Sequence, residues 1–356
     1  MRILKYLIFL LLITAIGVAI YVAIQPDNYK VSTNATIQAP QPVIYNYIND
    51  LKEWPKWSPW HEKDKNASVS FGEVSKGQDA SYSWNGETMG EGTIKTNYSK
   101  KDSINQTINF ITPYESTSKI FWTLSPVEKQ KETVVTWGME GKLSFTEKAM
   151  ILLKGDMEAD LTKDFNRGLQ KLDSLIISDM KKYSISIIGE TAYGGGYYLY
   201  QTASAKQNEI DIATKRIFPE IKSFMENSYV TAAGNEFILF QQMNDNNETA
   251  IFSASIPIKE RIGTPPGSTI LCDFIEPGNY FKTVLKGDYS NINETWIKAR
   301  EAMKQQNLEP DPTKYPFETH IRTSKEYPNP ADHLTEVYIP ILSSVNTSSV
   351  INTEQY

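Results

Sequence analysis

The N-terminal stretch constrains this chain most, because residues 7–24 form an apolar run that no charged residue interrupts. As a helix this run would be about 27 Å long, which is enough to cross the hydrocarbon core of a bilayer, with Tyr6 and Tyr21 near the two interfaces. A cleaved secretory signal usually has a shorter apolar region followed by a small-x-small cleavage site, and no Ala-x-Ala follows this run. The sequence therefore predicts an uncleaved transmembrane anchor over residues 1–28.

The charges that flank the run predict its orientation. Arg2 and Lys5 precede it, whereas Asp27 and Lys30 nearly cancel after it. Basic residues beside a membrane span favour the cytoplasmic side. We therefore expect a single-pass membrane protein with a cytoplasmic N-terminus and its soluble domains on the outer, periplasmic or extracellular, side.

Composition limits the other functions that the chain can have. Its 356 residues are enough for two domains of ordinary size. A net charge of −6 without a basic stripe argues against nucleic acid as a partner. The single cysteine, Cys272, excludes an intrachain disulfide, and the three histidines form no zinc-type ligand pattern. We expect no metal and no cofactor.

Residues 29–178 read as a first soluble domain of the α+β class. Alternating apolar residues from Val31 to Ile37 predict a strand, and Pro40 and Pro42 begin a short helix. A run of strand-like segments separated by turn residues then predicts an antiparallel meander. Those segments are residues 68–74, 79–84, 92–96, 103–111, 118–124 and 133–139. A long amphipathic helix with an apolar stripe from Met157 to Ile176 closes the domain. Together they predict a helix-grip, a curved sheet around a long C-terminal helix.

This first domain resembles the START-like, or SRPBCC, family of polyketide-cyclase and lipid-carrier folds. The resemblance rests on Thr-Ile-Gln-Ala-Pro at 36–40, Ile-Asn-Asp-Leu at 48–51 and Trp-x-x-Trp-Ser-Pro-Trp at 54–60. It implies a cavity between the sheet and the long helix for an apolar ligand, but no reaction. Trp54, Trp57 and Trp60, on what reads as a proline-fixed loop, are either a lid over that cavity or packing beneath the loop. His61 lies in a polar stretch and reads as solvated.

Residues 183–343 read as a second soluble domain, and residues 344–356 as a C-terminal tail. Two strands, at 185–188 and 191–203, precede a helix at 210–225, and strands at 236–242 and 249–256 follow it. The order then repeats, with strands at 268–274 and 279–286, a helix at about 290–305 and strands at 316–321 and 334–341. This predicts a duplicated β-α-β-β arrangement, with the helices on one face of a shared sheet and a groove on the other.

The last predicted strand, residues 334–341, places a carboxylate among apolar residues. Because side chains alternate along a strand, Val337, Ile339 and Ile341 should face a core, with Glu336 and Tyr338 on the opposite face. A negative charge beside aromatic and apolar side chains suits a pocket for a lipophilic molecule, including a cationic one. The alternative is that Glu336 lies on a solvated edge or pairs with a nearby lysine.

The second domain resembles the GyrI-like module, the effector-binding domain of AraC-type and other multidrug-responsive regulators. The matching residues are Glu-Pro-Gly-Asn-Tyr at 276–280, Leu-Lys-Gly-Asp-Tyr at 285–289, Glu-Thr-Trp at 294–296 and Thr-Glu-Val-Tyr-Ile-Pro-Ile at 335–341. The resemblance implies that Glu336 is the anionic anchor for a lipophilic ligand. It also implies aromatic walls at Tyr280, Tyr289, Trp296 and Tyr338. No helix-turn-helix precedes the module, so the resemblance does not extend to DNA binding.

These observations favour a membrane-tethered, non-enzymatic protein that binds small hydrophobic ligands or lipids, with no catalytic residue assigned. One alternative is a hydrolase in which Glu336 and a tyrosine activate water; this requires burial to raise the pKa of the carboxyl group toward neutrality. The other alternative is an interaction protein of the cell envelope, whose pockets are filled by its own side chains.

Overall fold

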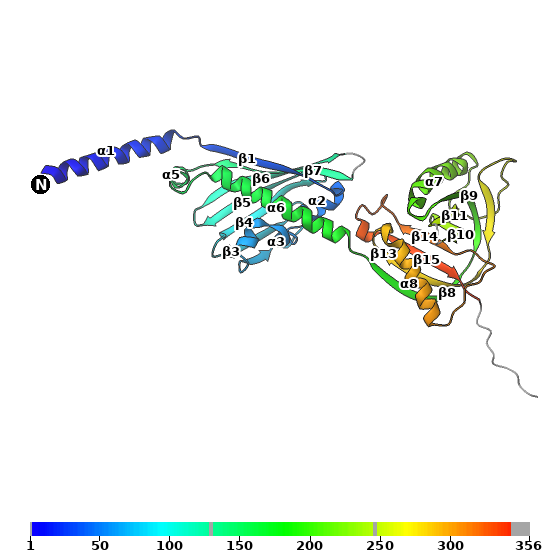
Figure 1. Ribbon diagram of the computed structural model, residues 1–356. Coiled ribbons are helices and arrows are strands. Elements are labelled where there is room, and N and C mark those ends of the chain that lie inside the picture. The colour runs from blue at the N-terminus through cyan, green and yellow to red at the C-terminus, as the bar shows by residue number, and fades with distance from the viewer. Residues whose placement is uncertain (1, 128–130, 245–247, 343–356) are drawn as a thin grey trace, which may run out of the picture. The chain divides into compact units, whose positions relative to one another are not determined.

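The computed structural model describes residues 2–127, 131–244 and 248–342, and Figure 1 shows them. The chain divides into two compact units, the first ending at Asp179 and the second beginning at Met180. Each unit contains one antiparallel sheet, so the predicted α+β class is confirmed. The expected C-terminal tail, residues 344–356, lies outside the described residues.

The first unit begins with the apolar helix. By length and composition, Ile3–Ile24 could cross a membrane. The elements of this unit are α1 (Arg2–Ile24), β1 (Asn28–Ile37), α2 (Gln41–Asn49), α3 (Trp54–Trp57), α4 (Pro59–Lys63), β2 (Ser68–Phe71), β3 (Ser81–Gly86), β4 (Gly90–Lys100), β5 (Ser103–Thr112), β6 (Ser116–Val127), β7 (Glu132–Lys142), α5 (Phe145–Lys154) and α6 (Met157–Met180). Helix α5 was not among the elements that the sequence predicted.

The sheet of this unit is the predicted meander with one addition at its edge. Its strands lie in the order β1-β7-β6-β5-β4-β3-β2, so every consecutive pair from β2 to β7 is a hairpin. β1 completes the sheet by pairing with β7 along its whole length, with Val31 opposite Met139. Sequential hairpins need only short connections, which is why the turn signals in the sequence located these strands.

The long helix α6 lies against this sheet (Figure 1). Its buried side chains include Phe165, Leu169 and Leu172, which belong to the predicted apolar stripe. Gly168 allows a close approach, because a Cβ atom there would lie 2.5 Å from the Trp137 ring and 3.1 Å from Pro59. The helix can therefore pack directly on a tryptophan of β7.

The tryptophan segment differs from its prediction. It forms two short helices, α3 and α4, and not a fixed loop. Pro55 and Pro59 occupy the first turn of each helix, where the missing N–H of proline would have no intrahelical partner anyway. The prolines therefore start helices here, and Trp54 and Trp57 become buried.

The second unit contains an eight-stranded antiparallel sheet in the order β12-β9-β11-β10-β14-β15-β13-β8. Its elements are β8 (Ser184–Tyr193), β9 (Gly196–Lys206), α7 (Ile210–Asn227), β10 (Phe237–Asn244), β11 (Thr249–Ile258), β12 (Leu271–Ile275), β13 (Gly278–Lys286), α8 (Ile292–Gln305), β14 (Phe317–Arg322) and β15 (Leu334–Pro340). Each half has two strands, a helix and two strands. This agrees with the predicted strand ranges but is one strand more than the β-α-β-β arrangement inferred from them. The first strand of each half pairs with the other half, β8 with β13 and β12 with β9.

The two faces of this sheet carry different side chains. One face forms a core with α7 and α8, and Val337, Ile339 and Ile341 belong to it, as the alternation along β15 predicts. The other face carries a separate, mainly aromatic cluster that includes Tyr338. Both helices therefore lie on one face, and packed aromatic side chains occupy the opposite one.

Candidate functional site

Glu336 lies at the margin of the aromatic face and is paired with a lysine. Its Oε1 atom is 2.8 Å from Nζ of Lys282, which lies on the neighbouring strand β13. Its Oε2 atom accepts a 2.6 Å hydrogen bond from the hydroxyl of Tyr338. The Lys282 ammonium also lies 5.2 Å from the centre of the Tyr338 ring. The structure therefore contains the alternative arrangement, in which Glu336 pairs with a nearby lysine.

Partial burial and hydrogen bonding change the pKa values of Lys282 and Tyr338. Desolvation opposes the charge of Lys282, but hydrogen bonds to Glu336 and Tyr338 outweigh it, and its pKa is raised. Burial, followed by the hydrogen bond to Glu336, raises the pKa of Tyr338 to about 12. Near neutral pH the site therefore contains a protonated lysine beside a neutral phenol.

Aromatic rings continue from this group of three across the face of the sheet. Phe317 stacks on Tyr338 with ring centres 4.8 Å apart, and Tyr280 meets Phe317 edge-on at 5.5 Å. Tyr193 touches all three of these rings. The cluster as a whole consists of Tyr193, Tyr198, Tyr200, Phe237, Leu239, Ile275, Tyr280, Phe317 and Tyr338. Most of its members are buried, so the rings fill the space that the sequence predicted as a groove.

Two of the predicted aromatic walls lie on the opposite face. Trp296 projects from α8 and donates a 3.1 Å hydrogen bond to Oε2 of Glu318, and the Tyr289 hydroxyl donates to Oε1 of the same group. Glu318 is fully buried. It stands opposite Val337, whereas its neighbour Thr319 stands opposite Glu336. The structure therefore brings Glu336, Tyr280 and Tyr338 together but places Tyr289 and Trp296 around a different carboxyl group.

Lys282 and Glu318 were missed in the sequence analysis. Both lie within predicted strands, and Lys282 follows Tyr280 by two residues, which places it on the same face. That alternation was the available signal. It does not show that Lys282 stands opposite Tyr338, because this pairing joins residues that lie far apart in the chain.

The first unit contains a cavity of about 220 Å³ with an aromatic wall. Its lining consists of Trp54, Trp60, Tyr82, Trp84, Met89, Ile94, Ile108, Phe110, Met139 and Leu161. Protein oxygens bind the indole N–H groups of all three lining tryptophans: Trp54 donates to the Ile48 carbonyl, Trp60 to Asp164 and Trp84 to the Met89 carbonyl. These N–H groups therefore need no partner from a ligand, and the wall is mainly apolar.

The other residues of the tryptophan segment do not line this cavity. Trp57 is fully buried and packs edge-on against Trp122 and Trp137. The interpretation of His61 as solvated is wrong, because both of its ring nitrogens are buried and have no hydrogen-bond partner within the described part of the chain. Burial lowers the pKa of His61, so its imidazole is neutral at pH 7. The ring lies 6.3 Å from that of Tyr82.

No family model matches this chain. No curated protein matches it either. Among solved structures it is similar to the C-terminal domain of EcmrR, with a TM-score of 0.40 and 14% identity over 46% of this chain and 99% of that one. It is also similar to SAV2435 bound to tetraphenylphosphonium (TM-score 0.34, 9% identity, 46% and 94%) and to CV1439 from Chromobacterium violaceum (TM-score 0.31, 13% identity, 41% and 95%).

Proposed function

We propose that this chain is a membrane-anchored, non-catalytic binding protein for compact lipophilic molecules. The observation that carries the proposal is the cavity of the first unit. Its wall is aromatic and aliphatic, and the N–H groups of its tryptophans are satisfied by the protein. Apolar cavities of about 150 Å³ hold benzene, and drug-sized sites run from about 300 Å³ upward. A cavity of about 220 Å³ suits a ligand of one or two rings better than a whole lipid.

A second observation favours a lipophilic cation as a ligand of the second unit. The Lys282 ammonium sits between the Glu336 carboxylate and the face of Tyr338, which is the environment that attracts a ligand cation. The side chain of Lys282 thus occupies a cation site built by Glu336, Tyr338 and the neighbouring Tyr280. A lipophilic cation would bind there by displacing the ammonium and opening the aromatic cluster.

Binding is a better match to this geometry than hydrolysis through Glu336. A general base needs an oxygen atom that can take a proton from water. One carboxylate oxygen of Glu336 contacts Lys282 and the other accepts from Tyr338. The proposal therefore assigns Glu336 to ligand attraction. An envelope interaction protein remains the alternative, and it predicts that neither unit takes up a ligand.

The family resemblances and the membrane topology belong to this proposal. A seven-stranded sheet packed on α6, with a cavity lined by both, supports a START-like helix-grip over residues 29–178. A duplicated sheet with an aromatic face supports a GyrI-like module over residues 183–343. The span Ile3–Ile24 supports an anchor, for which we propose a cytoplasmic N-terminus and outer-side domains.

The test is a titration of the full-length protein in lipid nanodiscs with 1-fluoronaphthalene, followed by ¹⁹F NMR. We expect a saturable bound signal that empty nanodiscs lack. Ile108→Phe, which fills the cavity, should abolish that signal. Ile111→Phe is the matched control, because it makes the same change at an exposed position of the same strand, β5. Equal binding by both variants, or no saturable signal in the wild type, would contradict the proposal.

A further inference from the structure

Helix α5 buries a charged side chain and exposes apolar ones, which is the reverse of a surface helix in water. Lys148, one of its two lysines, is only 7% exposed, whereas Phe145, Leu152 and Leu153 are 53%, 49% and 80% exposed. In a soluble protein the apolar stripe of a surface helix faces the core and its charges face water. An arrangement with the charge inside and the leucines outside is expected where the surroundings are not water.

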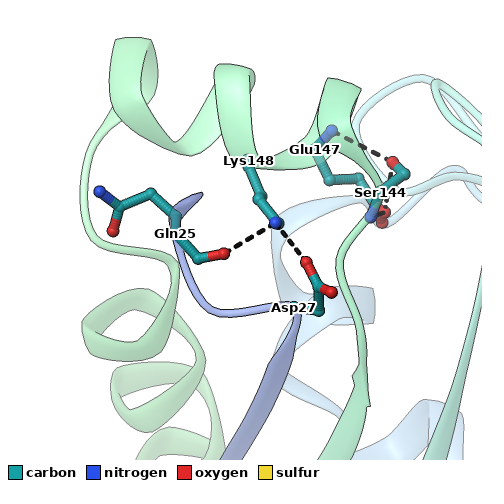
Figure 2. Close-up of polar contacts among 5 residues, drawn as sticks. All are labelled: Gln25, Asp27, Ser144, Glu147 and Lys148. Carbon is teal, nitrogen blue, oxygen red and sulfur yellow. Dashed lines mark hydrogen bonds and ion pairs between the residues drawn. The ribbon is translucent and has the colours of Figure 1, made fainter. Parts of the chain in front are cut away.

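Polar contacts fix this reversed orientation (Figure 2). Lys148 donates a 2.8 Å hydrogen bond to the backbone carbonyl of Gln25 and forms an ion pair with Asp27. The hydrogen bond from Lys148 holds the pKa of the Asp27 carboxyl below its usual value. A reciprocal capping box between Ser144 and Glu147 starts the helix. These contacts tie α5 to the segment that directly follows α1.

The contacts of α5 with α1 show its depth along the proposed membrane span. Val22 is the buried apolar residue of α1. A groove between the two helices is lined by Phe145 and Ala149 of α5 and by Leu11, Thr14, Ala15, Val18, Ala19 and Val22 of α1. If Ile3–Ile24 crosses a bilayer, these α1 residues lie within its hydrocarbon layer. The α5 side chains that share the groove then reach the same depth.

We infer that α5 is a second membrane element, inserted into the leaflet that holds the C-terminal half of α1. Phe145, Leu152 and Leu153 enter the hydrocarbon, while Lys148 stays neutralised against Asp27. Amphipathic helices bind membranes by burying an apolar face near the headgroup boundary, and α5 has such a face. The inference rests on the anchoring part of the proposed function. It holds the first unit against the bilayer, where lipophilic molecules concentrate.

The test is site-directed spin labelling of the full-length protein in lipid nanodiscs, in a Cys272→Ser background. Single cysteines replace Leu153 of α5, Leu12 of α1 and Phe71 of β2, all of them exposed. Molecular oxygen concentrates in hydrocarbon, whereas a nickel chelate stays in water. We expect the oxygen-to-nickel accessibility ratio at position 153 to resemble that at position 12 and to exceed that at position 71 several-fold.

The three positions separate the ways in which the inference can fail. A lipid-like ratio at position 12 with a water-like ratio at position 153 would overturn the membrane insertion of α5 and leave the anchor standing. Water-like ratios at both positions would overturn the anchor as well. Shielding of position 153 from both reagents, with spin–spin broadening at full labelling, would show that a second copy of this chain covers α5, which would also overturn the inference.

Discussion

The two units differ in whether the space over one face of the sheet is open or filled by side chains. In the first unit the face beneath α6 leaves a cavity among aromatic side chains, whereas in the second unit the aromatic side chains pack against one another and Lys282 occupies the charged position. Under the proposed function, a ligand would enter the first unit without displacing packed side chains. The second must give up contacts first. The comparison teaches that an aromatic surface alone does not define an open binding site. A ligand can enter directly only where the protein's own side chains do not already fill the space beside that surface.

The largest effect should come from removing the buried carboxyl group of the filled unit. Glu318→Ala would leave the Tyr289 hydroxyl and the Trp296 N–H without their acceptor. A buried donor left without its partner costs about 1–3 kcal/mol, and two donors are affected, so we expect the opening free energy of β14 and β15 to fall by about 3 kcal/mol or more. Amide hydrogen exchange followed by mass spectrometry would measure it. Glu336→Ala removes a carboxylate that is only partly buried and should cost less than about 1 kcal/mol; equal losses would show that the two carboxyl groups are equivalent.

The next test adds the same volume to each unit. Ile275→Phe enlarges a buried member of the filled aromatic cluster, and overpacking typically costs about 1–3 kcal/mol. Ile108→Phe places its ring in a cavity and should cost less than about 1 kcal/mol. The opening free energy of each local sheet, again from hydrogen exchange, provides the comparison. A larger loss for Ile108→Phe would mean that the cavity of the first unit is not available space.

A smaller effect should separate two contributions to cation binding: attraction of the ligand by Glu336 and competition from the Lys282 ammonium. Glu336→Gln removes the negative charge that attracts the cation and should weaken binding of tetraphenylphosphonium about tenfold, which corresponds to about 1.4 kcal/mol. Lys282→Met removes the internal competitor and should strengthen binding by a similar factor. Equilibrium dialysis of nanodisc-embedded protein against empty nanodiscs measures both. Weaker binding by both variants would show that Lys282 supports the ligand and does not compete with it.

The smallest effect concerns alkaline pH. The pKa of Lys282 is raised in the folded chain, so the stabilisation by its charge is fully present below the unfolded pKa of about 10.4. It is lost as pH rises through the folded value. The contribution should be below about 1 kcal/mol, because the lysine and glutamate side chains remain partly exposed. Thermal unfolding from about pH 9 to about pH 11.5 should show a downward slope that is shallower in Lys282→Met. Identical slopes would contradict the assignment.

Local patterns predicted the parts of the fold that depend on short separations. Alternation along β15 assigned Val337 and Glu336 to opposite faces, and the apolar stripe of α6 identified the helix that covers the first sheet. Turn signals located the meander because its neighbouring strands are consecutive in the chain. Glu336 and Tyr338 follow from the same alternation, whereas Tyr280 followed only from the GyrI-like resemblance. The structure brings the three residues to one face.

The features that the sequence did not predict depend on pairings between distant residues or on an unusual environment. The Lys282 to Glu336 contact requires the register between β13 and β15, which no local pattern specifies. Tyr289 and Trp296 were assigned to the wrong carboxyl group, because the resemblance did not show on which face α8 lies. Helix α5 escaped prediction because it turns Lys148 inward and Leu152 and Leu153 outward. The Ser144 and Glu147 capping box was the local signal that could have located its start.

Binding of a compact lipophilic molecule in the first unit is tested most directly by locating a bound ligand. Crystals of the full-length protein grown in a lipidic phase and soaked with 1-bromonaphthalene would give an anomalous signal at the bromine position. The proposed function predicts a peak within the cavity bounded by Trp54, Trp60 and Tyr82, and its loss in Ile108→Phe. A peak only between α1 and α5, or an empty cavity at saturating ligand, would contradict the claim that this unit is a binding domain.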